Sequence, residues 1–470
     1  MRADEDTPAI AGTAPKAAPP RTRRHRAHPG VPRRTLKRSQ RQRLIDAMIE
    51  LSLKRGYHDV PITELCAYAG VSPVTFYEQF RSKEDCFRAA YGSCAEQLFA
   101  RIRTIAIDGG EWSQVAREAL GELLAGLESD PDAGRLLFIE ALGAGPAIQA
   151  EREFVLTQFA SGAEQVMART PSGAGTLDVP VTAVIGALRH IISRYLRIHS
   201  ADRLPTLLEP GLQWLCAYAV PAGGAPWSTS PAALLEPDLK RQPVPAWAPQ
   251  TLPPGTHGLP AGVIMRSQRT RLIQATAEVM LTKGFAGAKV SDIVAAARVA
   301  RPVFYEHFAD KEQAFLEAQE HPTQFILDRC AQAYFSADEW PLRVWRGLST
   351  LLALIAANPA ISHLRLVECY AAGARAIRRA EEITRSFTIF LEEGYRYGER
   401  SSPPRLFSHA VAGAIFEVIR RRAAGGEWAQ LPRHLPQLTY IALAPFTGPP
   451  RAIELVEEIK AQEGVAQLAG

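Results

Sequence analysis

Four successive residues, Ser72, Pro73, Val74 and Thr75, have the chemistry to begin a helix that contacts DNA. A serine hydroxyl can accept hydrogen bonds from the exposed amides of a helix start, and proline fits the first helical position, where its missing N–H costs nothing. In a helix-turn-helix motif, the first residues of the second helix lie against base edges in the major groove. The sequence therefore predicts that Pro73, Val74 and Thr75 face DNA.

The side chains in and after this segment suit different contacts. Thr75 can hydrogen-bond a base or a phosphate, and Val74 or the Thr75 methyl can touch a thymine methyl group. Tyr77 and Lys83 follow at positions suited to phosphates, which provide affinity without sequence preference. We expect Thr75 and Val74 to read bases, and Tyr77 and Lys83 to hold the backbone.

The same string recurs 228 positions later with an altered turn. Residues 70–87 read GVSPVTFYEQFRSKEDCF, and residues 298–315 read RVARPVFYEHFADKEQAF. Arg298 replaces the glycine that suits a turn with positive φ, and Ala300 replaces the capping serine. Arg301 either offers a bidentate contact to guanine or is a solvated charge on a copy that is losing its function. The DNA-facing residues expected in this copy are Arg301, Val303, Tyr305 and Lys311.

The repeat extends far beyond these strings. RSQRQRLI at residues 38–45 matches RSQRTRLI at 266–273, and Trp112 matches Trp340. Gly186-Ala187 matches Gly413-Ala414 at an offset of 227, so the two copies stay in step to within one residue. Internal self-similarity of this length indicates a duplicated domain of about 180 residues. Copy one spans residues 38–220 and copy two spans 266–447.

Helical periodicity accounts for the elements that must position these residues. Apolar residues in RLIDAMIELSLKRGY recur at the spacing of one helix face. Thr63 and Ser291 are expected to cap the short helix before each turn, although no Glu or Gln follows Thr63 at the third position. Both, together with Ser72, are also expected among the DNA-binding residues. Alternating β-branched runs between turn dipeptides are absent, which indicates an all-α chain.

The pattern V-S-x-x-T-F-Y-x-x-F-x-S-K-E in copy one resembles the TetR family of bacterial transcriptional regulators, and FYEHFADKE in copy two is similar. The resemblance implies two tandem TetR-like units, each a three-helix helix-turn-helix domain followed by a helical domain for ligand binding and dimerisation. It implies a DNA-binding transcriptional regulator, a repressor released by a small-molecule effector, that acts on a double-stranded DNA operator. The phenylalanines of FYEQF and FYEHF are expected in the core.

The expected boundaries follow the repeat and the composition. A Pro-rich stretch between the copies cannot build a core and favours an extended tether. The expected parts are a disordered basic arm (1–37), DNA-binding domain 1 (38–98, helix-turn-helix about 61–80), regulatory domain 1 (99–220), a Pro-rich linker (221–262), DNA-binding domain 2 (263–326, helix-turn-helix about 289–308), regulatory domain 2 (327–447) and a C-terminal tail (448–470).

Charge is distributed unevenly along a chain of net charge +5. Residues 38–87 hold seven bases and seven acids, whereas residues 266–315 hold eight bases and five acids. The head of copy one is thus neutral, and its attraction to phosphates is expected to depend on the arm, unless the arm only aids solubility. The arm run contains eight bases and no acid: Arg21, Arg23, Arg24, Arg26, Arg33, Arg34, Lys37 and Arg38.

Several function classes find no support in the sequence. No stretch approaches the roughly 20 apolar residues that span a bilayer, and the N-terminus lacks an apolar signal region, so a cytoplasmic protein without membrane contact is expected. No catalytic motif or phosphate loop occurs, which predicts a protein that is not an enzyme and has no cofactor. His190, His199, His363 and His409 lack partners at metal-ligand spacing. The six cysteines are expected as reduced thiols: Cys66, Cys86, Cys94, Cys216, Cys330 and Cys369.

The resemblance also implies how the copies associate. The last two helices of each unit would pair with those of the other copy, through residues 411–422 and 435–446, with Gly186 and Gly413 permitting close approach. An effector pocket is implied between the middle helices. Its candidate lining residues, which are otherwise plain core, are Phe138, Phe154, Phe159, Trp345 and Tyr370.

Two functions remain open. The first is a regulator that acts as a single-chain pseudo-dimer on an operator with two unlike half-sites. The second is a ligand-binding or protein-interaction module in which one or both DNA-reading heads have decayed. The turn of copy two, with Arg298 and Ala300, is the feature that separates them.

Overall fold

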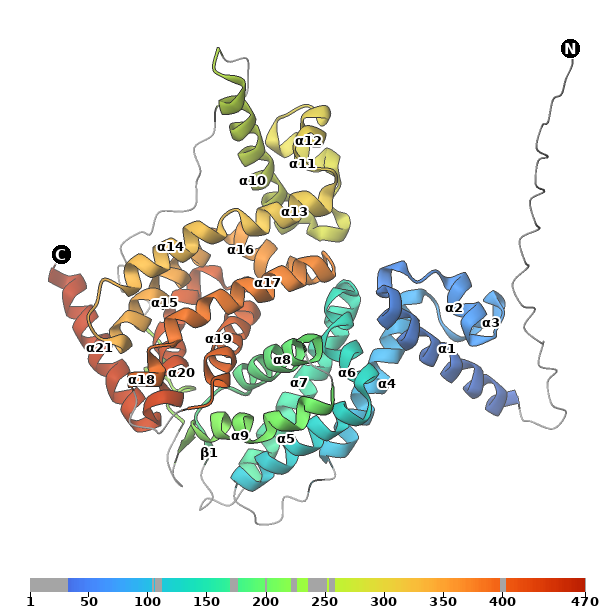
Figure 1. Cartoon of the computed structure of the whole chain (residues 1–470), viewed down its shortest axis with the longest axis horizontal. Coiled ribbons are helices and arrows are strands. Elements are labelled where there is room, and N and C mark those ends of the chain that lie inside the picture. The colour runs from blue at the N-terminus through green and yellow to red at the C-terminus, as the bar shows by residue number, and fades with distance from the viewer. Residues whose placement is uncertain are drawn as a thin grey trace, which may run out of the picture.

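The computed structural model describes residues 33–103, 105, 112–169, 176–198, 201–220, 226–235, 252, 258–397 and 403–469, and these are almost entirely helical. Figure 1 shows two heads, α1–α3 and α10–α12, on a common helical body. The predicted all-α fold with two tandem helical units is confirmed. Residues 1–32 of the basic arm lie outside the described part of the chain, as do residues 221–225, 236–251 and 253–257 of the expected linker.

The helices occur in the same order in both copies. Copy one contains α1 (Arg33–Arg55), α2 (Ile62–Ala69), α3 (Pro73–Gln79), α4 (Lys83–Arg103), α5 (Trp112–Ser129), α6 (Pro131–Phe138), η2 (Glu140–Gly143), α7 (Pro146–Arg169), α8 (Val181–Ile198), η3 (Ala201–Leu207) and α9 (Leu208–Cys216). Copy two contains α10 (Ala261–Gly287), α11 (Val290–Ala297), α12 (Arg301–His307), α13 (Lys311–Glu320), α14 (Thr323–Tyr334), α15 (Trp340–Ala357), α16 (Pro359–Leu366), η5 (Glu368–Tyr370), α17 (Ala374–Ser386), η6 (Phe387–Leu391), α18 (Gly394–Tyr397), α19 (Leu406–Ala424), η7 (Trp428–His434) and α20 (Leu435–Thr447).

Besides these helices, the described residues form two short strands and two further short helices. Two-residue strands β1 (Thr176–Leu177) and β2 (Ala219–Val220) pair antiparallel beside α8 and α9. The short helix η1 (Tyr57–Asp59) follows α1, and η4 (Pro231–Ala233) lies between the copies. Helix α10 contains a break at Gly284, where φ is 66°, so its regular part ends near the position where α1 ends.

The head of each copy is built around buried aromatic rings. Phe76 and Phe80, expected in the core, are buried, and they are joined by Phe87 from the start of α4. Phe304 and Phe308 occupy the same places in copy two. This apolar centre fixes α3 and α12 against the long first helices, because burial of large rings provides most of the stability of so small a domain.

The two copies differ where head joins body. Helix α4 continues for 21 residues from Lys83 to Arg103, whereas the same stretch of copy two divides into α13 and α14. Pro322 stands at the division, and a proline within a helix removes a backbone hydrogen bond and clashes with the preceding turn. The head of copy two is therefore connected to its body through a break in the helix.

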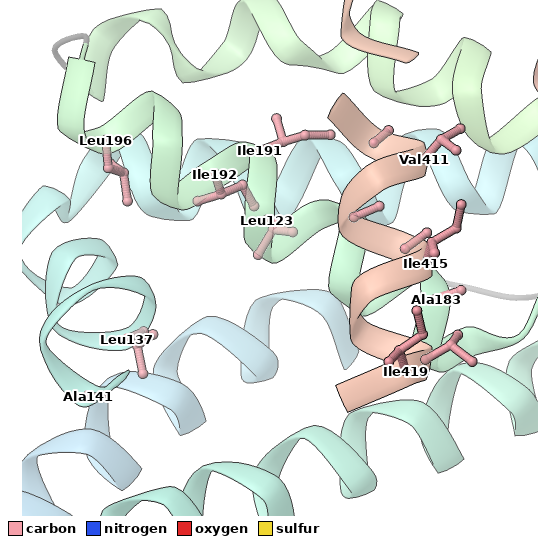
Figure 2. Close-up of a cluster of buried hydrophobic side chains, with 14 of the residues drawn as sticks. Leu123, Leu137, Ala141, Ala183, Ile191, Ile192, Leu196, Val411, Ile415 and Ile419 are labelled. Atoms are coloured by element: carbon pink, nitrogen blue, oxygen red, sulfur yellow. The ribbon is translucent and has the colours of Figure 1, made fainter. Parts of the chain in front are cut away.

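The copies meet through α8 and α19, which lie closely side by side. A Cβ atom added to Gly186 would lie 2.2 Å from the Glu417 Cβ, and one added to Gly413 would lie 2.7 Å from the His190 Cβ. The prediction that these glycines permit close approach is confirmed. Figure 2 shows Val411, Ile415 and Ile419 along α19, in the buried cluster that also contains Ile191, Ile192 and Leu196 of α8.

Helix α20 is buried along nearly its whole length and packs on α15, α19 and α21 (Pro449–Ala469). The expectation of a C-terminal tail over 448–470 was wrong, because residues 449–469 form α21. Its buried face consists of Ala452, Leu455, Val456 and Ile459, at the spacing of an amphipathic helix. Among the described residues between α9 and α10, none forms a helix equivalent to α21.

Part of the expected linker packs against the body. The Ser228 amide donates to Asp178 Oδ1 of copy one at 2.6 Å, and its carbonyl accepts from Gln437 Nε2 of copy two at 2.7 Å. The Leu235 amide donates to the Arg433 carbonyl at 2.8 Å. Residues 226–235 therefore form a clasp between the copies, because their backbone polar groups find partners on both.

Within the described ranges, no single helix has the length and apolar character to cross a membrane. The consecutive helices over residues 340–357 and 359–370 together have that length and apolar character, but they are bent by 105° relative to each other.

Candidate nucleic-acid interface and effector cavities

The turn of copy one has the predicted geometry. Gly70 ends α2 in the left-handed region, with φ 63° and ψ 37°. Ser72 precedes α3 and its Oγ accepts from the Thr75 amide at 3.1 Å, while Pro73 occupies the first helical turn. The turn and cap predicted from residues 70–73 are confirmed.

The outer face of α3 is available for contact with DNA. Val74 is 71% exposed and Tyr77 is 59% exposed, although both are large apolar or aromatic side chains. Thr75 is half-buried and its hydroxyl lies 3.0 Å from that of Ser72. Exposed apolar and aromatic residues on a capped helix suit base methyl groups and sugar–phosphate contacts.

The backbone of the turn in copy two follows the same path as in copy one, but its residues are less suited to that conformation. Arg298 ends α11 in the left-handed region with φ 52°, and it is the one non-glycine residue with positive φ among those the structure describes. Ala300 provides no side-chain cap for α12. Arg301 is exposed and its guanidinium lies 5.9 Å from the ring of Tyr305, which is 49% exposed, while Val303 is half-buried.

The predicted caps of the preceding helices were wrong. Thr63 and Ser291 are each the second residue of their helix and are exposed, and the residues before the helices are Pro61 and Lys289. In copy two the Lys289 amide donates to Asp292 Oδ2 at 3.0 Å. Each helix starts two residues earlier than we expected, which leaves both hydroxyls on the surface.

Lys83 and Lys311, which we expected to contact phosphates, donate hydrogen bonds within their own heads. Lys83 Nζ donates to the Tyr57 and His58 carbonyls, both at 3.0 Å. Lys311 Nζ donates to the Phe285 carbonyl at 2.6 Å and to the Ala288 carbonyl at 3.0 Å. Burial lowers the pKa of both ammonium groups. These lysines fasten the start of α4 or α13 to the chain that follows the first helix of the head.

Replacing Lys83 by Ala is accordingly expected to destabilise the head of copy one. Two carbonyls would lose a charged donor, which corresponds to about 1–3 kcal/mol. Urea denaturation followed by circular dichroism would measure the loss. Arg81→Ala, an exposed neighbour, is the control and should change stability by less than about 0.5 kcal/mol. A Lys83→Ala chain of unchanged stability but shallower salt dependence of DNA binding would restore the phosphate role.

The turn of copy two should become more stable when it is given the residues of copy one. Arg298→Gly removes the cost of about 1 kcal/mol that a side chain incurs in the left-handed region, and Ala300→Ser adds a cap of about 1 kcal/mol. Denaturation midpoints of the single and double variants would measure both gains. The reverse change Gly70→Ala should destabilise copy one, and equal stability of all these chains would contradict the assignment.

Sequence reasoning missed Arg41 and Arg269. Arg41 Nη1 donates to the Gln79 carbonyl at 3.0 Å, and its guanidinium lies 4.3 Å from the Phe80 ring centre. Arg269 makes the same contacts with His307 and Phe308. A cation at the end of α3 or α12 favours the helix dipole and holds the helix to α1 or α10. Their identical place in RSQRQRLI and RSQRTRLI was the available signal.

Hydrogen bonds connect each head to the body. His58 Nε2 lies 2.7 Å from the Gly143 carbonyl, and the Phe285 amide donates to Glu368 Oε2 at 2.6 Å. Gly143 lies beside α17, and α17 receives a hydrogen bond from Gln319 of the second head to the Ala376 carbonyl at 3.0 Å. A continuous path of contacts thus runs from head one through η2 and α17 to head two.

The body of copy one contains a cavity of about 620 Å³ between α4, α5, α7 and α8. Its lining is mainly apolar and includes Phe99, Trp112, Leu120, Phe159 and Leu188. Arg103 and two glutamines add polar groups. This volume lies within the range of about 300–1,000 Å³ that small-molecule sites occupy.

The equivalent place in copy two is filled by its own side chains. The cavity between α14, α15, η6 and α19 measures about 40 Å³. Gly162 and Ala163 of copy one correspond to Phe390 and Leu391, which line this smaller cavity. The Phe390 ring lies 5.1 Å from that of Tyr334. The two bodies therefore differ in the room they offer a ligand.

The five residues that the sequence suggested as pocket lining lie in different places in the structure. Phe159 lines the large cavity, and Phe138 lines a smaller one beside it. Phe154 is 61% exposed, so its expected place in a pocket was wrong, and Trp345 is part of the buried core. Tyr370 lines a separate cavity of about 70 Å³ in copy two.

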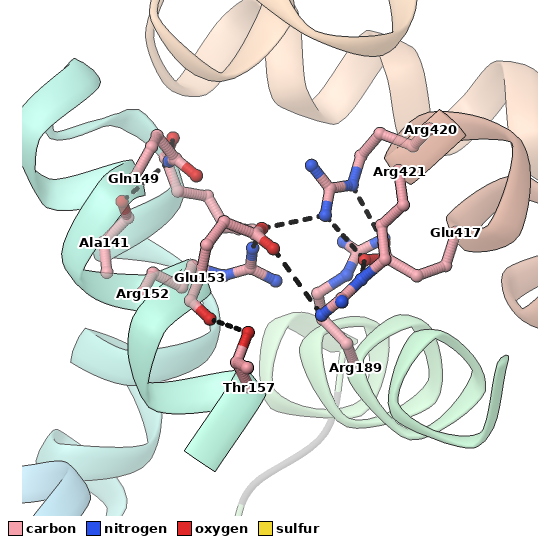
Figure 3. Close-up of polar contacts among 10 residues, drawn as sticks. Ala141, Gln149, Arg152, Glu153, Thr157, Arg189, Glu417, Arg420 and Arg421 are labelled. Atoms are coloured by element: carbon pink, nitrogen blue, oxygen red, sulfur yellow. Dashed lines mark hydrogen bonds and ion pairs between the residues drawn. The ribbon is translucent and has the colours of Figure 1, made fainter. Parts of the chain in front are cut away.

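A cluster of charged side chains is buried where α7, α8 and α19 meet, as Figure 3 shows. Arg420 donates to Glu417 at 2.6 Å and to Glu153 at 2.8 Å, and Arg189 lies 3.5 Å from Glu417. Glu417 has no exposed surface. Burial would raise the pKa of Glu417, but Arg420 and Arg189 hold it well below its usual range.

No group of three or more His, Cys, Asp or Glu residues within the described part of the chain is arranged to hold a metal ion. The His190 and His409 rings stack across the copies at 6.3 Å. Burial lowers the pKa of His190 to about 3 and that of His409 to about 4, so both rings are neutral at pH 7. His363 Nε2 lies 3.3 Å from Glu368, and His199 lies outside the described residues.

Comparison with known proteins identifies both heads. The sequence model of the bacterial regulatory proteins of the tetR family matches residues 44–90 and 272–318. No curated protein sequence matches the chain.

Several solved structures resemble part of the chain. The fatty acid degradation regulator FadR from Bacillus halodurans shares 18% identity with a TM-score of 0.35, over 37% of this chain and 94% of that protein. FadR from Bacillus subtilis in complex with stearoyl-CoA shares 16% with a TM-score of 0.34, over 37% and 97%. A TetR family transcription regulator from Marinobacter aquaeolei VT8 shares 16% with a TM-score of 0.32, over 39% and 97%.

Proposed function

Since the chain belongs to the TetR family of bacterial regulatory proteins and carries the DNA-binding domain of that family twice, we propose that it is a repressor that binds an operator as a single-chain pseudo-dimer and is released by a small-molecule effector. The observation that carries the proposal is the seam between α8 and α19. At this seam the two bodies of one chain lie so close that a Cβ atom added to Gly186 would be 2.8 Å from the Gly413 carbonyl oxygen. This is the place where the resemblance implies pairing between subunits.

The two heads would read different half-sites. Helix α3 presents Pro73, Val74 and Tyr77, whereas α12 presents Arg301 and Tyr305. An exposed arginine can select guanine through a bidentate contact, and an exposed valine favours a thymine methyl group. The preferred operator is therefore an imperfect palindrome. The basic arm, expected beside the neutral head of copy one, would add affinity without sequence preference.

The effector would bind in copy one. Its cavity of about 620 Å³ is large and apolar, while the equivalent space in copy two is occupied by Phe390 and Leu391. The same helix α7 that lines the cavity follows η2, whose Gly143 carbonyl contacts His58 of the first head. A ligand that displaces α7 would thus alter the position of head one relative to head two.

Light scattering of the protein, free and on a DNA fragment from its own upstream region, tests the proposal. We expect one chain in solution at micromolar concentration and one chain per operator, with protection of two unlike half-sites in a footprint. Two chains on a symmetric site, or a stable dimer without DNA, would show that the duplication serves another end.

The second candidate is a ligand-binding or protein-interaction module whose second head has decayed. The positive φ of Arg298 and the missing cap at Ala300 favour it, since both weaken the turn that carries α12. In that case a footprint would extend over one half-site only.

A further inference from the structure

We infer that the effector is an apolar organic acid, bound once per chain with its carboxylate against Arg152 and Arg189 of copy one. This inference rests on the proposed function, because it names the chemical class of the ligand for the same cavity. The argument begins with a second, smaller cavity at the inner end of the first.

The inner cavity measures about 70 Å³ and shares five lining residues with the large one: Phe99, Leu123, Phe159, Ile185 and Leu188. The rings of Phe99 and Phe159 stack at 5.2 Å between the two spaces. A rotation of these two side chains would join the cavities. A ligand that enters the large cavity can therefore reach the inner one along a continuous apolar surface.

The inner cavity has an unusual pair of cations in an otherwise apolar wall. Arg152 and Arg189 line it, and their exposed fractions are 4% and 9%. Apart from these two and Tyr91, the residues that line it have apolar side chains. Burying a guanidinium without a full set of partners is costly, so two of them at the end of an apolar space require an explanation.

The surrounding cluster does not neutralise this charge. Four arginines (Arg152, Arg189, Arg420 and Arg421) meet two glutamates (Glu153 and Glu417) in Figure 3. The Nε of Arg189 is buried without a hydrogen-bond partner. Arg152 Nη1 donates to Glu153 Oε1 at 2.9 Å, yet burial and the neighbouring Arg189 and Arg420 still lower the pKa of Arg152. One bound carboxylate would supply the missing acceptor oxygens, and it matches the planar guanidinium in geometry.

Copy two has a cavity of about 70 Å³ at the equivalent place, but its arginines, Arg189, Arg365 and Arg420, face a carboxylate in the same lining, that of Glu381. The positions equivalent to Arg152 and Arg189 hold Ala380 and Phe416. Phe390 and Leu391 reduce the adjoining larger space to about 40 Å³, so only copy one has room for an apolar chain beside its cations. The expected stoichiometry is therefore one acid per chain.

The position of Arg189 also indicates how binding would reach the other copy. Its Nη2 lies 3.5 Å from Glu417 Oε2 of α19, and its guanidinium lies 5.9 Å from the Tyr370 ring. A ligand carboxylate would compete with Glu417 for this guanidinium. Binding would thus weaken an ion pair across the seam that holds the two heads in register.

Binding of decanoate, 1-decanol and decylamine to the full chain tests the inference. Isothermal titration and the fluorescence of Trp112, which lines the large cavity, give affinity and stoichiometry. We expect one decanoate per chain, bound about ten- to a hundredfold more tightly than 1-decanol, because the alcohol has the same chain but no charge. Decylamine should bind most weakly.

Five variants at three positions separate the parts of the site. Arg152→Met should reduce the affinity for decanoate to that for 1-decanol and leave 1-decanol unchanged, whereas Arg152→Lys should restore part of the difference. Arg421→Met, in the same cluster but outside the cavity lining, is the matched control and should bind decanoate normally. Gly162→Phe, which copies Phe390, should abolish binding of both compounds, and Gly162→Ala should retain it.

The outcomes distinguish this inference from the proposed function. Equal affinities for decanoate and 1-decanol, or two decanoates per chain, would overturn the inference while operator binding stands. A chain that binds decanoate at Arg152 yet fails to retard DNA would support the inference and overturn the repressor. No binding of any of the three compounds would overturn the inference, whatever the DNA result.

Discussion

Replacing Glu417 by Gln should lower the free energy of unfolding by about 3–5 kcal/mol at pH 7, because it leaves buried cations without their main counter-charge. Glu417 accepts from Arg420 at 2.6 Å and lies 3.5 Å from Arg189 of the other copy. Chemical denaturation followed by circular dichroism would measure the loss. Glu427→Gln is the matched control, since its 2.9 Å ion pair with Arg422 is exposed and worth about 1 kcal/mol or less.

The effect of this substitution should depend on pH in a defined direction. The folded-state pKa of Glu417 is lowered, so its contribution is fully present above the unfolded pKa of about 4.3 and is lost as the pH falls below it. The native chain should therefore lose stability between about pH 5 and pH 3, whereas the Glu417→Gln chain should lose less over the same interval. Parallel pH profiles of the two chains would contradict the assignment.

Disabling one head should lower operator affinity by a factor of about 10²–10⁴, because the second binding event is then lost from an intramolecular pair. Arg301→Ala with Tyr305→Ala removes the exposed side chains of α12 without touching the core. Affinity measured by fluorescence anisotropy, and a footprint reduced to the half-site of copy one, would record the effect.

The matched experiment uses the other head. Thr75→Ala with Tyr77→Ala should produce a loss of similar size and leave protection on the half-site of copy two. A normal affinity after the change in α12 would favour the candidate in which the second head has decayed. Normal affinity after both changes would remove α3 and α12 from the interface.

Local chemistry made the heads predictable from the sequence. Gly70, Ser72 and Pro73 each have one conformational preference, and the preferences agree, so the turn and the start of α3 follow directly. Because the two copies align at a nearly constant offset along their length, the prediction made for one copy could be applied to the other. The small residues Gly186 and Gly413 identified the seam, because close helix approach requires them.

Features that depend on residues distant in the sequence were harder to predict. Lys83 and Lys311 resemble surface cations in the sequence, but carbonyl groups some 26 residues earlier, at Tyr57 and Phe285, hold them. The volume of the large cavity depends on the side chains that other helices place opposite Gly162. No local sequence pattern shows which side chains these are. The amphipathic spacing of α21 was present in the sequence and would have indicated a helix in place of a tail.

The clasp at residues 226–235 bears on how these molecules avoid joining one another. A chain with two complementary halves is able to pair its first half with the second half of a neighbour, and repetition of that exchange gives open-ended polymers. Ser228 bonds to Asp178 on one side and to Gln437 on the other, and Leu235 bonds to Arg433. Domain swapping would have to break these bonds with at least one half of the chain. We therefore expect the connecting segment to favour pairing of the two halves within one chain over pairing between chains.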